Sequence, residues 1–234
     1  MSTATGKKKP RASRGGLVEE AYRQLKHKII HCELRPGYQA LEDDLAGQLG
    51  MSRIPVREAL IRLEREGFVE IIPRRGVRVT PLTVKDIQQI SEVLSCLECE
   101  AAEKLALRRP DADELKRLEL AIEGMDRALE LDDMQAWGEA DYEFHRALIE
   151  MCGNRHLANV AKNFLDRAHR FRLLTLPHRD KPVYSNVNHA AVVEAIRRGD
   201  AQTALDIHRG HKRRWGRELS DILDRANLTS NESA

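Results

Sequence analysis

Apolar residues recur every three or four positions along most of the chain, and glycine or proline interrupts this helical pattern at intervals. The first stretch predicts a helix that ends before the Pro36-Gly37 turn. Its apolar face consists of Val18, Ala21, Tyr22, Leu25 and Ile29. We therefore expect a mostly helical protein.

Residues 44–60 predict two short helices around a tight turn. Gly50 suits the end of the first helix, and Ser52 suits the N-terminal cap of the second. Pro55 is tolerated in the first turn of a helix but not further along, so it fixes where the second helix begins. This pattern indicates a helix-turn-helix.

The second of these helices presents two arginines away from its apolar side. Arg53 and Arg57 are four residues apart and share one face. The apolar stripe on another face consists of Val56, Ala59, Leu60 and Leu63. An exposed arginine pair near the start of a second helix is what reading the DNA major groove requires, so we predict that Ser52, Arg53 and Arg57 contact DNA.

A basic hairpin is predicted directly after the helix-turn-helix. Residues 68–72 and 77–79 are short β-prone runs, and the Pro-Arg-Arg-Gly turn between them contains Arg74, Arg75 and Gly76. Alone, such a hairpin is usually a solvated turn. In this position it is typical of a DNA-binding wing, in which Gly76 permits close approach to the backbone and Arg74 or Arg75 enters a minor groove.

Beyond Pro81 the pattern is helical and shows no strand signal. Thr83 is placed to cap a helix that begins near Val84. The remainder is divided into about six helices by interruptions at residues 109–110, 131–134, 152–154, 177–182 and 199–200. Amphipathic helices in this number predict a bundle.

The expected fold is therefore mostly α, with an N-terminal winged helix-turn-helix domain followed by an all-α helical bundle. The divisions that we expect are a disordered basic tail at 1–15, the winged domain at 16–80, a linker at 81–86, the helical domain at 87–226 and a frayed tail at 227–234.

Composition and charge agree with this division. The 234 residues are 41% hydrophobic and only 4% aromatic, which favours helices over a β-rich fold. Residues 1–80 carry 16 Lys and Arg against 10 Asp and Glu, whereas residues 81–234 carry 23 against 27. A basic front half suits nucleic-acid binding. No stretch approaches the roughly 18 apolar residues of a membrane span and no secretory signal is evident, so we expect a cytoplasmic protein with no membrane contact.

The four cysteines follow no disulfide-framework spacing. Cys96 and Cys99 form a single Cys-x-x-Cys inside a helical pattern, with no second pair to complete a zinc knuckle. We interpret them as buried or half-buried thiols, with a redox or ligand role as the alternative.

Polar residues on the core-facing side of three predicted helices form a candidate metal site. Asp141 and His145 are four residues apart and share one face, while His189 and His211 lie on two later helices. One carboxylate and three imidazoles suit Zn²⁺, Ni²⁺, Mn²⁺ or Fe²⁺, and leave coordination positions for water or an acidic ligand. His208, three residues before His211 on nearly the same face, competes with it as a ligand.

Other interpretations of these residues remain open. A lone histidine on an apolar face is more often a hydrogen-bonded core residue, and Asp and His ligands with an open position also describe a metalloenzyme. The chain offers no evident general base or nucleophile for an enzyme, so we expect none. The remaining histidines are interpreted as surface or turn residues: His27, His31, His156, His169 and His178.

The two halves together resemble the GntR family of bacterial transcriptional regulators, in the subgroup whose helical C-terminal domain is like that of FadR (the FCD type). The resemblance covers roughly residues 17–226. Its front half is carried by residues 45–46, 51–60, 63–67 and 75–79, and its back half by residues 141–145, 188–190 and 195–200 and by His211.

For the front half, the resemblance implies that Arg53 and Arg57 contact operator bases or phosphates and that Gly76 enters the minor groove. It implies a homodimeric regulator, repressor by family default, that binds a palindromic double-stranded operator. Ile54 stands where the family usually has Thr, which alters the expected DNA contacts.

For the back half, the resemblance implies an effector-binding and dimerisation domain with a divalent metal held by Asp141, His145, His189 and His211. Family spacing selects His211 over His208. A small carboxylate is the usual effector, but Leu94 replaces the usual arginine. Arg172 is our candidate for the missing charge, with His208 as a further effector contact. The alternative is a metal-free regulator that binds an acyl or other apolar effector.

Overall fold

The computed structural model describes residues 14–226, so the expected tails at 1–15 and 227–234 lie almost wholly outside the described residues. The chain divides into two compact units. The first contains residues up to Ile29 and Gly37–Thr80, and the second contains Ile30–Pro36 and the residues from Pro81 onward. The chain therefore passes between the two units three times.

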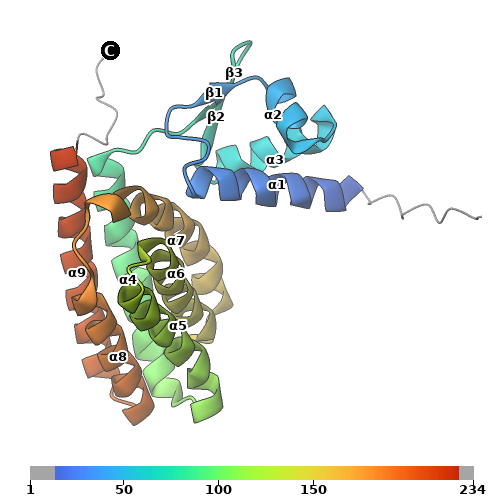
Figure 1. The fold of residues 1–234 in the computed structure, drawn as a ribbon. Coiled ribbons are helices and arrows are strands. Elements are labelled where there is room, and N and C mark those ends of the chain that lie inside the picture. Colours follow the sequence, from blue (N-terminus) through green and yellow to red (C-terminus); the bar gives the residue numbers. More distant parts are fainter. Residues whose placement is uncertain (1–13, 227–234) are drawn as a thin grey trace, which may run out of the picture. The chain divides into compact units, whose positions relative to one another are not determined.

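The first unit is a winged helix-turn-helix (Figure 1). Three antiparallel strands form a small sheet in the order β1-β3-β2, with Val69 opposite Val79 in the β2–β3 hairpin. The elements of this first unit are α1 (Arg14–Ile30), β1 (Gln39–Ala40), α2 (Glu42–Leu49), α3 (Arg53–Arg65), β2 (Val69–Ile72) and β3 (Gly76–Val79). The fold class predicted for this half is confirmed.

The turn between α2 and α3 follows the residues that predict it. Gly50 ends α2 in the left-handed region at φ 63°, and its backbone N–H donates to the carbonyl groups of α2. Pro55 occupies the first turn of α3 and is buried. Ser52 has the extended backbone of an N-cap, but its side chain accepts no capping hydrogen bond. The hydroxyl of Ser52 therefore remains exposed at the front of the helix.

A charged cluster joins α1 to the end of α3. Lys26 Nζ donates to Tyr22 Oη and Glu66 Oε2, both at 2.7 Å, and Tyr22 Oη donates to the Glu66 carboxylate. Burial would raise the pKa of Glu66, but the hydrogen bonds from Lys26 and Tyr22 outweigh burial and lower it. The ammonium group of the buried Lys26 thus has the paired environment that a buried charge requires.

Gly76 is needed for a reason beyond the tip of the wing. It opens β3 at φ 89°, and a Cβ atom there would lie 2.2 Å from the carbonyl oxygen of Ala40 in β1. Strand β1, which the sequence pattern did not indicate because it has only two residues, occupies the space that a side chain would need. The turn itself contains residues 73–75, and Arg74 has φ 64°.

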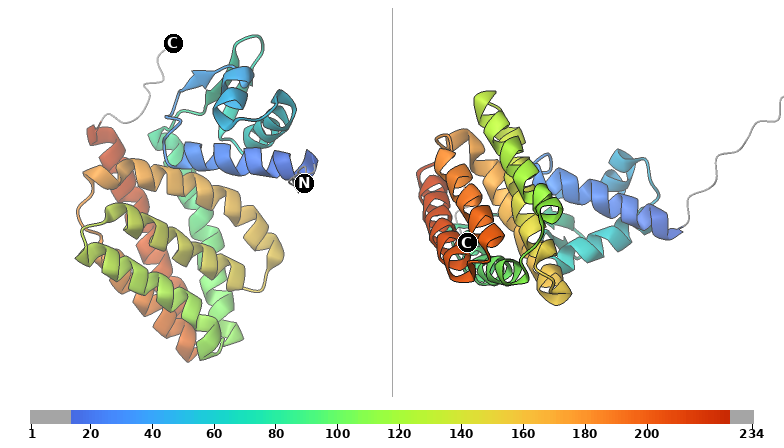
Figure 2. Two further views of the ribbon diagram at one scale, coloured as in Figure 1. Left: turned by 45° about the vertical axis from the view of Figure 1, so that its right-hand side comes forward. Right: turned by 90° about the horizontal axis from the view of Figure 1, so that it is seen from below.

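Within residues 14–226 the second unit is a bundle of six α-helices, and the predicted interruptions match the breaks between them to within one residue. Helix α4 contacts α6, α7, α8 and α9, and the helices of this unit lie side by side (Figure 2). The elements are α4 (Val84–Arg108), α5 (Ala112–Glu130), α6 (Met134–Met151), α7 (Arg155–Thr175), the short η1 (Leu176–His178), α8 (Val183–Arg198) and α9 (Ala201–Ala226).

Two expected boundaries differ from the structure. Helix α4 begins at Val84, where Thr83 caps it as predicted: the Thr83 side chain accepts a hydrogen bond from the Asp86 N–H. The helix therefore occupies part of the segment 81–86, which was expected to be a linker. Helix α1 begins at Arg14, before the expected start at residue 16. None of the helices in residues 14–226 has the length and apolarity needed to cross a membrane.

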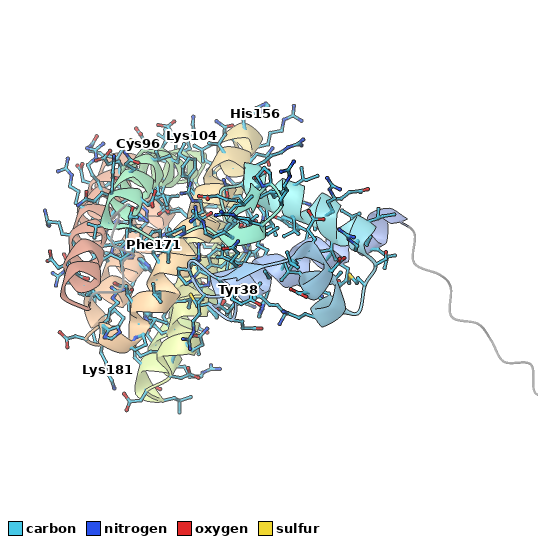
Figure 3. All side chains as sticks on the ribbon, turned by 90° about the horizontal axis from the view of Figure 1, so that it is seen from above. Tyr38, Cys96, Lys104, His156, Phe171 and Lys181 are labelled. Atoms are coloured by element: carbon cyan, nitrogen blue, oxygen red, sulfur yellow. The ribbon has the colours of Figure 1, made fainter. Side chains whose placement is uncertain are left out.

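The bundle interior is closely packed around apolar side chains. Phe171 lies inside it, whereas Lys104, Cys96 and His156 point outward (Figure 3). The interpretation of Cys96 as buried or half-buried is therefore wrong. Cys99 is buried as expected. Three residues are less than one full helical turn, so the side chains of Cys96 and Cys99 point in different directions.

We predict that Gly76→Ala destabilises the protein by about 3 kcal/mol, because the new Cβ meets a backbone carbonyl that cannot move without breaking the β1–β3 pairing. Gly37→Ala is the matched control: Gly37 also has positive φ, at 77°, but nothing lies within 4 Å of the place that its Cβ atom would occupy. That control should lose only about 1 kcal/mol. Equal losses in urea unfolding of both variants would contradict the close approach.

Candidate DNA-binding face and metal centre

The predicted DNA-contacting arginines are on an exposed face of α3. The side chains of Arg53 and Arg57 are 64% and 67% exposed. Arg53 Nε lies 2.6 Å from Asp43 Oδ1, and Arg57 Nε lies 4.0 Å from Glu42 Oε1. Ion pairs at this exposure are weak, so phosphate oxygens can replace the carboxylates at little energetic cost.

The wing offers a second set of exposed cations in the same unit. Arg74 and Arg75 lie in the turn between β2 and β3, and both are exposed. Gly76, beside them, is fixed by its packing against Ala40. The structure therefore presents every cation that the sequence nominated for DNA, while the contact of Gly76 with a minor groove stays a prediction.

The four predicted metal ligands come together inside the bundle. Asp141 and His145 extend from α6, His189 from α8 and His211 from α9, and each is at most 4% exposed. One ring nitrogen from each histidine lies within 4.8 Å of the others. His189 Nε2 is 3.1 Å from Asp141 Oδ1, and His145 Nε2 is 3.6 Å from Asp141 Oδ2.

The helix faces explain this convergence. Asp141 and His145 are one turn apart on the buried side of α6, together with Phe144 and Leu148. The ring of Phe144 stacks on that of His189 with a centroid distance of 4.1 Å and an interplanar angle of 4°. This stacking holds the His189 ring with its nitrogen toward Asp141.

Burial sets the protonation states of the cluster. Burial lowers the pKa of His145 to about 4, against the opposing effect of Glu98 and Asp141. Burial, followed by repulsion from His189 and His145, holds the pKa of His211 well below its usual range. These imidazoles are therefore neutral near pH 7, which is the form that binds metal ions.

Asp141 is kept ionised by a buried arginine. Burial alone would raise the pKa of its carboxyl, but the Arg172 guanidinium outweighs burial and holds that pKa well below the usual range. Arg172 Nε lies 2.9 Å from Asp141 Oδ2, and the side chain of Arg172 is 1% exposed. Within residues 14–226, Arg172 Nη1 has no hydrogen-bond partner. The candidate effector residue therefore lies directly beside a candidate metal ligand.

A buried glutamate that was not predicted from the sequence lies on the other side of His145. Glu98 of α4 is 0% exposed, and its Oε2 is 2.8 Å from both His145 Nδ1 and His208 Nε2. Lys212 Nζ donates to Glu98 Oε1 at 3.1 Å. Burial would raise the pKa of Glu98, but His145 and Lys212 hold it well below its usual range. The signal was the position of Glu98 on the apolar stripe of α4, one turn after Leu94.

The two competing histidines of α9 are separated by these contacts. His211 groups with His145 and His189, whereas His208 groups with Glu98 and His145. His208 bonds Glu98 and does not line the cavity described below, so the geometry gives no support to it as an effector contact. His169, which was interpreted as a surface or turn residue, is 2% exposed and lies against Tyr142 with a ring distance of 4.5 Å. That interpretation is wrong, because the residue lies on the inner side of α7.

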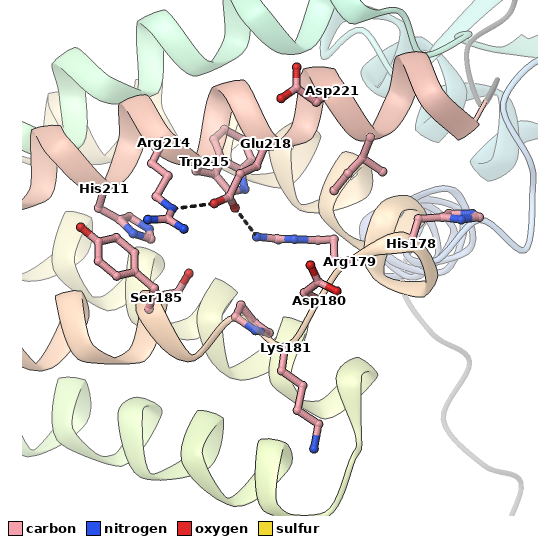
Figure 4. A pocket seen from close by; sticks show the side chains of 13 residues that line it. His178, Arg179, Asp180, Lys181, Ser185, His211, Arg214, Trp215, Glu218 and Asp221 are labelled. Carbon is pink, nitrogen blue, oxygen red and sulfur yellow. Dashed lines mark hydrogen bonds and ion pairs between the residues drawn. The ribbon is translucent and has the colours of Figure 1, made fainter.

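A cavity of about 230 Å³ adjoins the cluster at His211 (Figure 4). It lies among the segment before α8, the start of α8 and the middle of α9, and its lining includes Arg179, Ser185, Arg214 and Trp215. A cavity of about 150 Å³ holds benzene, so this volume suits a molecule of about ten non-hydrogen atoms.

The residues present fit a divalent metal. His145 Nε2 and Asp141 Oδ2 are buried without a hydrogen-bond partner in the described part of the chain, and both lie in the cluster. Three imidazoles and one ionised carboxylate are ligands that Zn²⁺, Ni²⁺, Mn²⁺ and Fe²⁺ accept. Asp141, His145, His189 and His211 are therefore the residues that would hold such an ion.

A winged helix-turn-helix with exposed arginines, joined to an all-helical domain, is the architecture of a class of DNA-binding transcriptional regulators. Two family models match the chain: "Bacterial regulatory proteins, gntR family" over residues 17–79 and "FCD domain" over residues 89–214. The protein belongs to the GntR family and carries an FCD-type C-terminal domain.

Relatives and solved structures agree with this assignment. The chain is 31% identical to the HTH-type transcriptional regulator YdhC of Bacillus subtilis, over 87% of this chain and 91% of that protein. It is 25% identical to the HTH-type transcriptional repressor RspR of Escherichia coli, over 78% and 79%. The structure of E. coli McbR/YncC has the same fold, with a TM-score of 0.77 at 22% identity over 90% of this chain and 99% of that one.

We predict that Glu98→Gln destabilises the metal-free protein by about 3 to 5 kcal/mol, because it leaves the ammonium of Lys212 buried without its carboxylate. The double variant Glu98→Gln/Lys212→Met removes both charges and should be more stable than Glu98→Gln alone. Denaturant unfolding in the presence of a chelator measures both values. A double variant less stable than the single variant would show that the two charges are not coupled.

Proposed function

We propose that this protein is a homodimeric transcriptional repressor whose binding to a palindromic operator is controlled by a small carboxylate at a metal centre. The observation that carries the proposal is the buried cluster of Asp141, His145, His189 and His211 in the same chain as an exposed arginine helix. An interior this polar is unfavourable unless its groups find partners, and a metal ion with its ligand supplies them.

The DNA-binding part of the proposal rests on geometry in the first unit. Ser52, Arg53 and Arg57 lie at the front of α3, where a recognition helix presents side chains to base edges. Arg74 and Arg75 extend the positive charge to a hairpin, which suits a minor groove or a phosphate backbone. In a dimer the two recognition helices would contact the two halves of a symmetric site.

The effector part rests on Arg172 and the metal ligands. Arg172 lies at 2.9 Å from Asp141 and has an unused Nη1 donor, so a carboxylate bound beside a metal ion has a guanidinium within reach. The bound metal would supply positive charge and open coordination positions for that carboxylate. Arg172 thus replaces the family arginine that is absent at Leu94, which is buried and apolar.

The effector controls DNA binding if it binds one arrangement of the bundle more tightly than another. Its differential affinity shifts the population of the two arrangements, and the dimer then holds its DNA-binding units at a different spacing. The assignment of the protein as a repressor is supported by its similarity to the repressor RspR of E. coli. A metal-free regulator with an apolar effector is disfavoured, because the cluster interior contains ionised Asp141 and Glu98.

We predict that Arg53→Ala/Arg57→Ala lowers affinity for the operator by at least about 100-fold, since each base or phosphate contact contributes about 1 to 3 kcal/mol. The operator is the sequence that the wild-type protein selects from random DNA, and fluorescence anisotropy measures the affinity. The control Arg23→Ala/Arg65→Ala removes the same charge from exposed positions of α1 and α3. Unchanged affinity of the first variant, or a loss equal to that of the control, would contradict the DNA-binding assignment.

We predict that protein purified without an affinity tag contains close to one equivalent of divalent metal per chain, and that His189→Ala and His211→Ala lose it. The lost ligands leave too few donors to hold the ion. Elemental analysis by mass spectrometry measures the content. The control His156→Ala removes an exposed histidine of α7 and should retain the metal. Wild-type protein that neither contains nor takes up Zn²⁺, Ni²⁺, Mn²⁺ or Fe²⁺ would reduce the cluster to a polar core.

A further inference from the structure

Among the described residues that line the cavity beside His211, two buried nitrogen atoms lack a hydrogen-bond partner, and both are donors. Arg179 has a side chain that is only 4% exposed, and its Nη1 has no hydrogen-bond partner in the part of the chain that the structure describes. The indole Nε1 of Trp215 also has no hydrogen-bond partner among the described residues, and Trp215 is 4% exposed. Both residues line the cavity. No lining acceptor among the described residues is buried and unpartnered in this way.

The carboxylates around the cavity do not satisfy these donors. Glu218 lies 3.3 Å from Arg179 Nη2, and it is also bound by Arg214 Nε at 2.6 Å (Figure 4). Asp180 and Asp221 also line the cavity, but neither forms a hydrogen bond with Arg179 Nη1. Glu218 is thus shared between two arginines, and one side of the Arg179 guanidinium remains available to a ligand.

A second buried guanidinium makes this site more positive. Burial, followed by repulsion from Arg172, lowers the pKa of Arg179. Arg172 lies over the ring of Trp215, at 5.4 Å from its centroid, and Arg179 lines the same cavity as Trp215. Two buried arginines that repel each other are unfavourable without anions. Asp141 pairs with Arg172, whereas the partner of Arg179 is Glu218, which Arg214 also binds.

We propose that the effector is a small dianion: one anionic group binds at the metal centre beside Arg172, and a second binds Arg179 and Trp215 Nε1 in the cavity. This inference rests on the proposed function and goes beyond it by naming a second recognition point and the charge of the ligand. The cavity volume of about 230 Å³ suits a chain of four or five carbons. The second group is a carboxylate or a phosphate, both of which a guanidinium fork binds.

Calorimetric titration of the full chain loaded with Zn²⁺ tests this inference. The probes are butanoate, butanedioate and 3-phosphonopropanoate, which share a length and differ in the second group. We expect at least one dianion to bind at least about tenfold more tightly than butanoate, in line with one additional charge-assisted hydrogen bond. The tighter of the two dianions identifies the second group.

Variants of Arg179 then test whether this residue causes the preference for a dianion over butanoate. Arg179→Gln should reduce the ratio of dianion affinity to butanoate affinity to within about twofold, and Arg179→Lys should retain part of the preference. Arg213→Gln, which removes an exposed charge of α9 outside the cavity, should keep the full preference. Circular dichroism and thermal unfolding verify that each variant is folded.

The outcomes separate this inference from the proposed function. If the wild type binds monoanion and dianion equally, or if Arg179→Gln retains the preference, the inference of a dianionic effector is wrong. The proposed metal-dependent, carboxylate-controlled regulator is unaffected by either result. Binding of none of the probes overturns the dianion as well. Failure of the protein to take up Zn²⁺ overturns the proposed function itself.

Discussion

The interior of the helical domain depends on the neutralisation of two buried carboxylates. Asp141 and Glu98 are ionised inside a bundle that excludes water, and the loss of hydration of each charge costs several kcal/mol unless neighbouring groups replace it. Their partners come from other helices: Arg172 from α7, His189 from α8, and Lys212 from α9. The need to compensate two charges therefore fixes how five of the six α-helices pack.

His145 connects the two carboxylates. Its Nδ1 faces Glu98 at 2.8 Å, and its Nε2 faces Asp141 at 3.6 Å. A ring held from one nitrogen by a carboxylate has a fixed orientation and presents its other nitrogen in a defined direction, which is how proteins position metal-binding histidines. Glu98 thus lies where a carboxylate can orient the His145 ring. Its place on α4, the helix that contacts four others, links the polar cluster to those helices.

Most of the fold could be predicted from the sequence, because helical periodicity, Gly and Pro are local signals. The ends of α5, α6 and α7 fall at the expected interruptions, and Thr83 caps α4 as predicted. The burial of Asp141, His145, His189 and His211 was also predicted, since a polar residue on an apolar face is visible in one helix at a time. Their binding of a metal ion stays a prediction. The need for Gly76 to be small was not visible, because it depends on Ala40, which is distant in sequence.

What the sequence could not show was pairing between helices. Glu98 is a carboxylate on the apolar stripe of α4, but the sequence does not name its partner, and only the packing of α4 against α9 brings Lys212 to it as a buried pair. The same holds for Arg179, which follows a turn and has a buried side chain because the bundle surrounds it. Side chains whose role depends on long-range contacts therefore need the structure.

The three passages of the chain between the two units affect how such proteins can be recombined. Residues 30–36 group with the helical unit, although they lie between α1 and β1 of the winged unit. A gene fusion that joins the first 80 residues to another sensor would separate this segment from the side chains it packs against. Exchange of sensors between relatives therefore requires that residues 30–36 be exchanged together with the helical domain, as one discontinuous module.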